Sequence, residues 1–95
     1  MSNASKYDLS QNYPNPFNPI TKIDYQVSQD SKVMLKIYDI TGKEVMTLVN
    51  TQQNAGYYTV QFDASNLSSG NYFYKLIASS NGNETVITKK MTVIK

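Results

Sequence analysis

The sequence contains no cysteine, no histidine, no arginine and no tryptophan. Without cysteine it has neither a disulfide framework nor a thiolate metal site. Without histidine it lacks the commonest general base and the commonest zinc ligand, and without arginine it lacks the side chain that binds phosphate through two parallel hydrogen bonds. We therefore expect no enzyme activity, no catalytic or metal-binding residues and no cofactor.

Net charge and chain length further restrict the class of protein to which the sequence can belong. Nine Lys against seven acidic residues give a net charge of +2, which is too small to indicate a nucleic-acid-binding protein. No run of about 18 apolar residues is present, so we expect no transmembrane segment. The 95 residues, of which 40% are hydrophobic, suffice for one domain with its own core. We expect residues 1–8 to be an expression remnant and linker, residues 9–95 to form the domain, and the whole to derive from a longer protein.

All three prolines lie in one short segment between Asn12 and Thr21. Proline fixes its own φ, extends the residue before it and cannot donate to a sheet ladder, so we expect a stiff, extended segment. Its two aromatic rings favour a structural cap that closes one end of the core, with Phe17 buried. A proline-rich recognition peptide is the weaker interpretation, because the prolines do not form a polyproline helix of any length. The expected cap consists of Tyr13, Pro14, Pro16, Phe17 and Pro19.

Alternation of apolar and polar residues with a period of two runs through most of the chain and predicts β-strands. The glycines fall in the turns between them, and Asn81-Gly82 is the strongest short hairpin signal. We expect an all-β protein, an immunoglobulin-like β-sandwich of about seven antiparallel strands with Greek-key connections. The expected strands are an edge strand within Lys6–Gln11, then Thr21–Val27, Val33–Tyr38, Lys43–Val49, Tyr57–Phe62, Tyr72–Ile77 and Glu84–Ile94.

Two local features refine this prediction. The alternation in Lys43–Val49 changes phase at Met46, which indicates a bulge or sheet crossover, and the polar residues 50–54 after it predict a loop. Leu67, Gly70 and Tyr72 have the spacing of a tyrosine corner. In that motif a tyrosine early in a strand bonds backwards to the backbone of the preceding arch.

Three sets of polar or aromatic residues are open to a functional interpretation. Asp39 and Asp63 are calcium-ligand candidates, although aspartates that stabilise turns are the favoured reading. Tyr38 and Tyr57 are predicted to point outward, either as a binding patch or as a cross-strand pair. The third set consists of Lys89, Lys90 and Lys95. These residues are either ordinary solvent-facing lysines on an edge strand, which composition favours, or a basic tail presented to a receptor.

Taken in order, a series of short motifs resembles the type A C-terminal sorting domain of the type IX (Por) secretion system. The motifs are Leu9 to Pro19, Thr21-x-Ile23, Ile37-Tyr38-Asp39-x-x-Gly42, Ala55-Gly56, Ser69-Gly70-x-Tyr72-Phe73-Tyr74, Thr88-Lys89-Lys90-Met91 and the terminal lysine. Each motif alone is weakly specific, but their order over Leu9 to Lys95 is specific.

The resemblance implies a non-catalytic β-sandwich at the end of a larger secreted cargo protein. It implies passage across the outer membrane by the secretion machinery after transient residence in the periplasm. Removal by a sortase-like surface protease would follow, with the cargo attached to the cell surface or released. The residues that it places in sorting recognition are Gly70, Tyr72, Lys89, Lys90 and Lys95. Asn71 and Tyr57 depart from the family pattern, where a small apolar residue and a histidine are frequent.

Two other classes stay open at this stage. One is a structural immunoglobulin-like module similar to that of flagellar hook-capping proteins, whose chain would continue beyond the module. The other is a carbohydrate-binding β-sandwich, which would present a coplanar pair of exposed aromatic rings. A sorting signal must instead lie at the extreme C-terminus of its parent, as the ending at Lys95 indicates.

Overall fold

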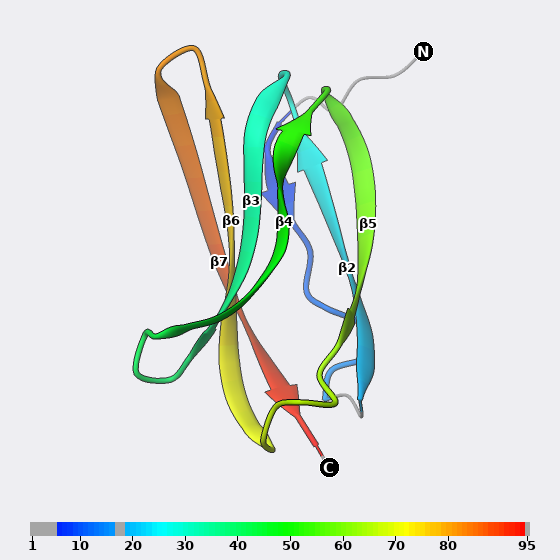
Figure 1. Ribbon diagram of the computed structural model, residues 1–95. Coiled ribbons are helices and arrows are strands. Elements are labelled where there is room, and N and C mark those ends of the chain that lie inside the picture. Colours follow the sequence, from blue (N-terminus) through cyan, green and yellow to red (C-terminus); the bar gives the residue numbers. More distant parts are fainter. Residues whose placement is uncertain (1–5, 17–18, 95) are drawn as a thin grey trace.

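A computed structural model of the chain describes residues 6–16 and 19–94. These residues form two antiparallel β-sheets that face each other (Figure 1). Within the described ranges there is no helix, and accordingly no helix long and apolar enough to cross a membrane. The all-β prediction is confirmed. The strands are β1 (Asp8–Leu9), β2 (Ile20–Val27), β3 (Ser31–Asp39), β4 (Glu44–Gln53), β5 (Gly56–Asp63), β6 (Gly70–Ser80) and β7 (Asn83–Val93).

The strand order gives the sandwich its crossed topology. The first sheet, sheet A, has the order β1-β2-β5, and the second, sheet B, has the order β4-β3-β6-β7. The chain passes from sheet A to sheet B after β2, returns for β5, and crosses back so that β6 pairs with β3. Crossovers of this kind place β7, the last strand, at an open edge of sheet B.

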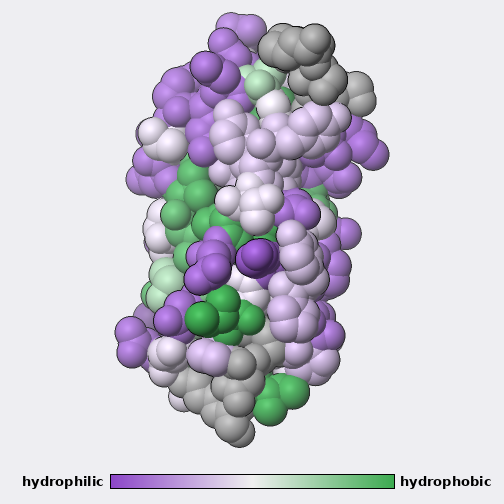
Figure 2. Space-filling model, turned by 90° about the vertical axis from the view of Figure 1, so that its right-hand side faces the viewer, coloured by the Kyte–Doolittle hydropathy of each residue, from purple (hydrophilic) through white to green (hydrophobic). Residues whose placement is uncertain are grey.

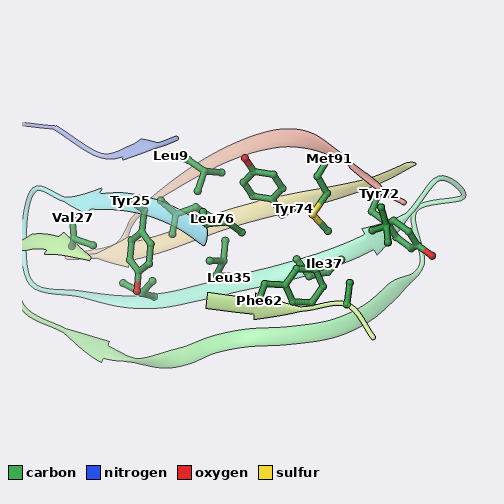
Figure 3. Close-up of a cluster of buried hydrophobic side chains, with 14 residues drawn as sticks. Leu9, Tyr25, Val27, Leu35, Ile37, Phe62, Tyr72, Tyr74, Leu76 and Met91 are labelled. Atoms are coloured by element: carbon green, nitrogen blue, oxygen red, sulfur yellow. The ribbon is translucent and has the colours of Figure 1, made fainter. Parts of the chain in front are cut away.

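The core lies between the sheets and is built from alternate residues of each strand. Ile23, Tyr25 and Val27 of β2 and Val33, Leu35 and Ile37 of β3 are buried, as their alternation predicts. Figure 3 shows aromatic rings among these aliphatic side chains in the space between the strands. The other fully enclosed hydrophobic residues are Leu9, Phe62, Ala64, Tyr74, Leu76, Ala78, Met91 and Val93.

Strand β4 is irregular, as the phase change in its sequence predicts. Leu35 pairs with Val49 but Lys36 pairs with Thr47, so Leu48 is an extra residue. A second extra residue, Val45, follows between the next pairs. Both extra residues still pack partly against the core. The bulges bend the strand, and Figure 1 shows β4 curving strongly along its length.

The loop predicted for residues 50–54 is wrong over most of its length. Asn50 to Gln53 continue β4, and they pair with Met34 to Ser31 of β3. Their polar side chains hid the strand because Asn50, Thr51 and Gln52 are all exposed, so this end of the edge strand is solvated on both faces and shows no alternation. Gln53 even contributes across the sandwich, where its side-chain oxygen accepts a hydrogen bond from the Tyr25 hydroxyl at 2.7 Å.

The predicted turns are present, and aspartates stabilise two of them. The Asp39 carboxylate accepts hydrogen bonds from the backbone N–H groups of Thr41 and Lys43 at 2.9 and 3.0 Å. The hydrogen bond from the Thr41 hydroxyl is the main cause that lowers the Asp39 pKa. Asp63 likewise accepts from the Ser65 N–H at 2.9 Å. The turn-stabilising interpretation is therefore confirmed. No cluster of three potential metal-ligand side chains occurs among the described residues.

Candidate functional site: the N-terminal arm and the last two strands

The segment from Ser10 to Pro16, here called the N-terminal arm, connects β1 to β2 across the open side of the sandwich. In Figure 1 it is the blue segment that runs from β1 toward the lower part of the molecule. Tyr13 and Lys22 exchange two backbone hydrogen bonds of 2.9 Å, which fix the arm beside β2. The arm contains cis peptide bonds before Pro14 and before Pro16.

Asn12 is the buried anchor of the arm, with 2% of its surface exposed. Its backbone N–H donates to the Tyr74 hydroxyl at 2.8 Å, and its side-chain NH₂ donates to the Thr21 hydroxyl and to the Pro14 carbonyl, both at 3.1 Å. The remaining side-chain oxygen accepts from Gln11 at 2.7 Å. Every polar group of the Asn12 side chain is thus hydrogen-bonded, which burial of an amide requires.

Tyr74 holds the arm from the side of sheet B. Its hydroxyl donates to the Ser10 carbonyl at 2.7 Å while it accepts from the Asn12 N–H. Burial raises the pKa of Tyr74 to about 12, although the Asn12 hydrogen bond opposes this shift. A single phenol therefore connects sheet B to two backbone groups of the arm, the Ser10 carbonyl and the Asn12 N–H.

The residues expected to form a cap lie mostly at the surface of the arm. Tyr13 is 46% exposed, and its hydroxyl donates to the Asp24 carboxylate at 3.0 Å. That hydrogen bond is the main cause that raises the Tyr13 pKa. Pro14 and Pro16 are exposed and Pro19 is half-buried, while Phe17 lies outside the described residues. The Tyr13 ring therefore does not enter the core, and among the described arm residues Asn12 is the buried one.

The arm also contacts β7, the strand at the edge of sheet B. The Gln11 side chain donates to the Lys90 carbonyl at 2.7 Å, and the Asn15 side-chain oxygen accepts from the Thr92 N–H at 3.0 Å. These backbone groups of β7 point away from β6. Two side-chain amides of the arm thus satisfy two outward backbone groups in the C-terminal part of this sheet edge.

The predicted sorting residues that the structure describes lie together on the β6–β7 hairpin. Gly70 pairs with Val93 and Tyr72 pairs with Met91. Lys90 and Lys89 pair with Phe73 and Tyr74, the next residues along β6. Lys95 lies outside the described residues. The tertiary structure therefore joins two motifs that are about twenty residues apart in the sequence.

Tyr72 forms the predicted tyrosine corner. Its hydroxyl donates to the Ser68 carbonyl at 2.8 Å, and the residue is 8% exposed. Gly70 has a φ of +150°, a backbone conformation that residues with a Cβ rarely adopt. These two residues shape the start of β6, and this geometry by itself accounts for a glycine and a tyrosine at these positions.

A hollow of about 360 Å³ lies beside Gly70 and Tyr72. Ile40, at the tip of the β3–β4 turn, lines it and is 70% exposed. Sequence reasoning did not single out Ile40, although a large apolar residue inside a polar turn is the signal that would have found it. The hollow is lined by Asp39, Ile40, Ser69, Gly70, Asn71 and Tyr72.

The two tyrosines predicted to point outward do not meet. Tyr57 is on β5 of sheet A and is 61% exposed. Tyr38 is half-buried on β3 of sheet B, where the Lys75 ammonium lies 4.8 Å from its ring centroid. A joint patch of the two tyrosines, or a pair formed by one with the other, is excluded because the residues belong to different sheets. Tyr38 forms its cross-strand pair with Phe73 of β6.

The outer face of sheet A holds a second hollow, of about 350 Å³, around Asp24 and Tyr57. Figure 2 shows this side of the molecule, where small hydrophobic areas are scattered among hydrophilic ones. The Asp24 carboxylate accepts from the hydroxyls of Tyr13 and Thr59 at 3.0 and 2.7 Å. It thereby connects the arm, β2 and β5, a structural role.

Comparison with known proteins places this geometry in a family. The chain is similar to part of dimeric latent PorU from Porphyromonas gingivalis, with 26% identity and a TM-score of 0.75. The likeness covers 93% of this chain and only 9% of PorU. No curated protein sequence matches the chain. The family of secretion system C-terminal sorting domains matches residues 11–95. The chain therefore belongs to the secretion system C-terminal sorting domains and acts as a sorting signal in protein secretion.

Proposed function

We propose that this domain carries a larger cargo protein, joined to its N-terminus, across the outer membrane through the type IX secretion machinery. Export leads to attachment of the cargo at the cell surface or to its release. A sortase-like surface protease that removes the domain is the second partner. We propose no catalytic role for the domain itself, since it lacks histidine and cysteine and acids such as Asp24, Asp39 and Asp63 stabilise strands and turns.

The observation that supports this proposal best is the arrangement of the β6–β7 hairpin. The expected recognition residues Gly70, Tyr72, Lys89 and Lys90 lie on its two paired strands. Lys90 is exposed and Lys89 is half-buried on the opposite face of β7, so the two lysines lie next to each other at one edge of the sandwich. Charged groups in such a position mainly set the specificity of an encounter and its rate. We propose that Lys95, which lies outside the described residues, also takes part in recognition.

The test is a secreted reporter with the domain fused to its C-terminus, in a host that has a type IX system. The fusion is expected at the cell surface. Replacement of both Lys89 and Lys90 by Ala is expected to leave the reporter in the periplasm. The matched control replaces two exposed lysines elsewhere, Lys32 and Lys43, and changes the net charge equally. Surface delivery of the control but not of the test variant supports the proposal.

Two further measurements make the result decisive. Thermal unfolding of each purified domain shows whether the variants are folded, because a misfolded domain would fail for a trivial reason. A short polar extension after Lys95 tests whether the machinery needs the free end of the chain. If the lysine variant and the extended variant both reach the surface at the unmodified level, neither the lysines nor the terminus are recognised.

A further inference from the structure

The outward edge of β7 is the longest regular edge of the sandwich. Edge strand β1 has two residues, edge strand β4 carries two bulges, and edge strand β5 is regular but has eight residues. Strand β7 runs for 11 residues in unbroken register with β6. Long regular edges are the ones that accept an added strand.

The direction of the backbone groups along β7 follows from its contacts with the arm. The Lys90 carbonyl and the Thr92 N–H bond to the arm, so they point away from β6. Backbone groups of alternate residues in an antiparallel strand point to the same side. The N–H and C=O groups of Val86 and Thr88 therefore also point outward. Among the described residues they have no backbone or side-chain partner.

Lys89 has an unusual position on this edge. It lies on the same face as Ile87 and Met91, the face that packs toward the core, and it is half-buried beside Tyr74. The ion pairs among the described residues are Lys6–Asp8 and Lys36–Glu44, so Lys89 has no acidic partner there. An inward-facing charge on an edge strand discourages the addition of an ordinary apolar strand, because its ammonium would lose water without compensation.

We propose that the outward edge of β7 over Glu84 to Thr88 is a docking site for an extended strand of a partner protein that carries a carboxylate opposite Lys89. The backbone groups of Val86 and Thr88 supply the hydrogen bonds of strand addition, and Lys89 selects an acidic strand. The arm and β1 limit the site on its C-terminal side, since β1 contacts β7 and Gln11 and Asn15 occupy the edge from Lys90 onward. The proposal rests on the sorting function, because the partner is a component of the export machinery.

A second copy of the chain fits this edge less well. When two β7 edges pair antiparallel with their Ile87 residues opposite each other, each Lys89 lies opposite Thr85 of the other copy. Threonine offers no charge to compensate for the desolvated ammonium. An acidic partner strand does so, and it is therefore the occupant that the charge of this edge favours.

The test uses the purified domain and two synthetic peptides, followed by NMR. The probe is acetyl-Thr-Glu-Thr-Val-Thr-Val-Thr-amide, which sets its glutamate opposite Lys89 when it pairs antiparallel to β7. The matched control peptide has lysine in place of the glutamate. We expect the acidic peptide to shift the amide signals of Val86 and Thr88, and to bind about fivefold more tightly than the basic peptide.

Two variants test the geometry and the charge separately. Val86→Pro removes an outward N–H while the ladder to β6 keeps its hydrogen bonds, so binding should be lost in a folded domain; Val86→Thr is its control. Lys89→Glu should reverse the order of the two peptides. Lys90→Glu, which changes the net charge equally on the outer face, should leave the order unchanged.

Three results of the peptide titrations would each overturn the proposal. These are the absence of amide shifts at millimolar peptide, equal affinity for the two peptides, and reversal of their order by Lys90→Glu. Self-association of the domain through β7, detected by sedimentation, would also overturn it in favour of a second copy. None of these measurements involves secretion. A failure here therefore leaves the reporter experiment and the sorting function untouched.

Discussion

The buried hydroxyl of Tyr74 accepts a hydrogen bond from the backbone N–H of Asn12 at 2.8 Å. The two residues are 62 positions apart in the chain. Their contact joins the start of the domain to the middle of sheet B. It also holds the arm in the position from which Gln11 and Asn15 reach the edge of β7.

Removal of this hydroxyl should destabilise the domain. In Tyr74→Phe the buried Asn12 N–H and Ser10 carbonyl lose their partner, and an unsatisfied buried group costs about 1–3 kcal/mol. The free energy of unfolding in urea measures the effect. Tyr57→Phe, at a ring that is 61% exposed, is the control and should change the stability by less than about 0.5 kcal/mol. Equal effects of the two substitutions would contradict the anchoring role of Tyr74.

The raised pKa of Tyr74 predicts a loss of stability in alkaline solution. The pKa of the Tyr74 hydroxyl is about 12 in the folded state, whereas its ordinary value, which applies to the unfolded chain, is 10.0. The unfolded chain therefore releases this proton first. The contribution of the protonated Tyr74 phenol to the free energy of unfolding is therefore complete below pH 10. It falls by roughly 2 kcal/mol as the pH rises from 10 to 12. Unfolding of the parent and of Tyr74→Phe should be compared over this range. Their difference in stability should shrink with pH, and a constant difference would refute the shift.

The tyrosine corner should contribute one ordinary hydrogen bond. Tyr72→Phe removes the bond to the Ser68 carbonyl and should lower the free energy of unfolding by about 1 kcal/mol. The ring remains in place, so the fold should be intact by circular dichroism. In the reporter assay this variant separates the two roles proposed for Tyr72. Normal sorting would show that the hydroxyl serves the fold alone.

The contact between the arm and β7 can be tested by hydrogen exchange. Asn15→Ala removes the acceptor of the Thr92 N–H, so this amide should exchange roughly tenfold faster with solvent. Asn71→Ala is the matched control. The Asn71 side-chain oxygen accepts a hydrogen bond from the Thr92 hydroxyl and not from the Thr92 N–H, so exchange of this amide should not change. An unchanged exchange rate in Asn15→Ala would show that the arm does not protect this edge in solution.

Local sequence signals predicted the elements that depend on local physics. The alternation of Ile23, Tyr25 and Val27 predicted a half-buried strand because side chains in a strand point alternately to its two faces. Asn81 and Gly82 predicted a hairpin turn, and they adopt φ values of +51° and +81°, as a tight turn of this type requires. The spacing of Gly70 and Tyr72 predicted the corner because its hydrogen bond spans only four residues. The order of the motifs predicted the family.

Tertiary structure decided the features that depend on which strands become neighbours. The role of Asn12 depends on Tyr74, and that of Gln11 on Lys90, which lies 79 residues later. No local pattern encodes such contacts. The polar residues from Asn50 to Gln53 form a strand because β3 supplies the hydrogen-bonding partner. In the same way, composition favoured a solvent-facing Lys89, which is wrong for this lysine: the register of β7 puts it on the face of Ile87 and Met91, where the packing of the two sheets leaves it half-buried.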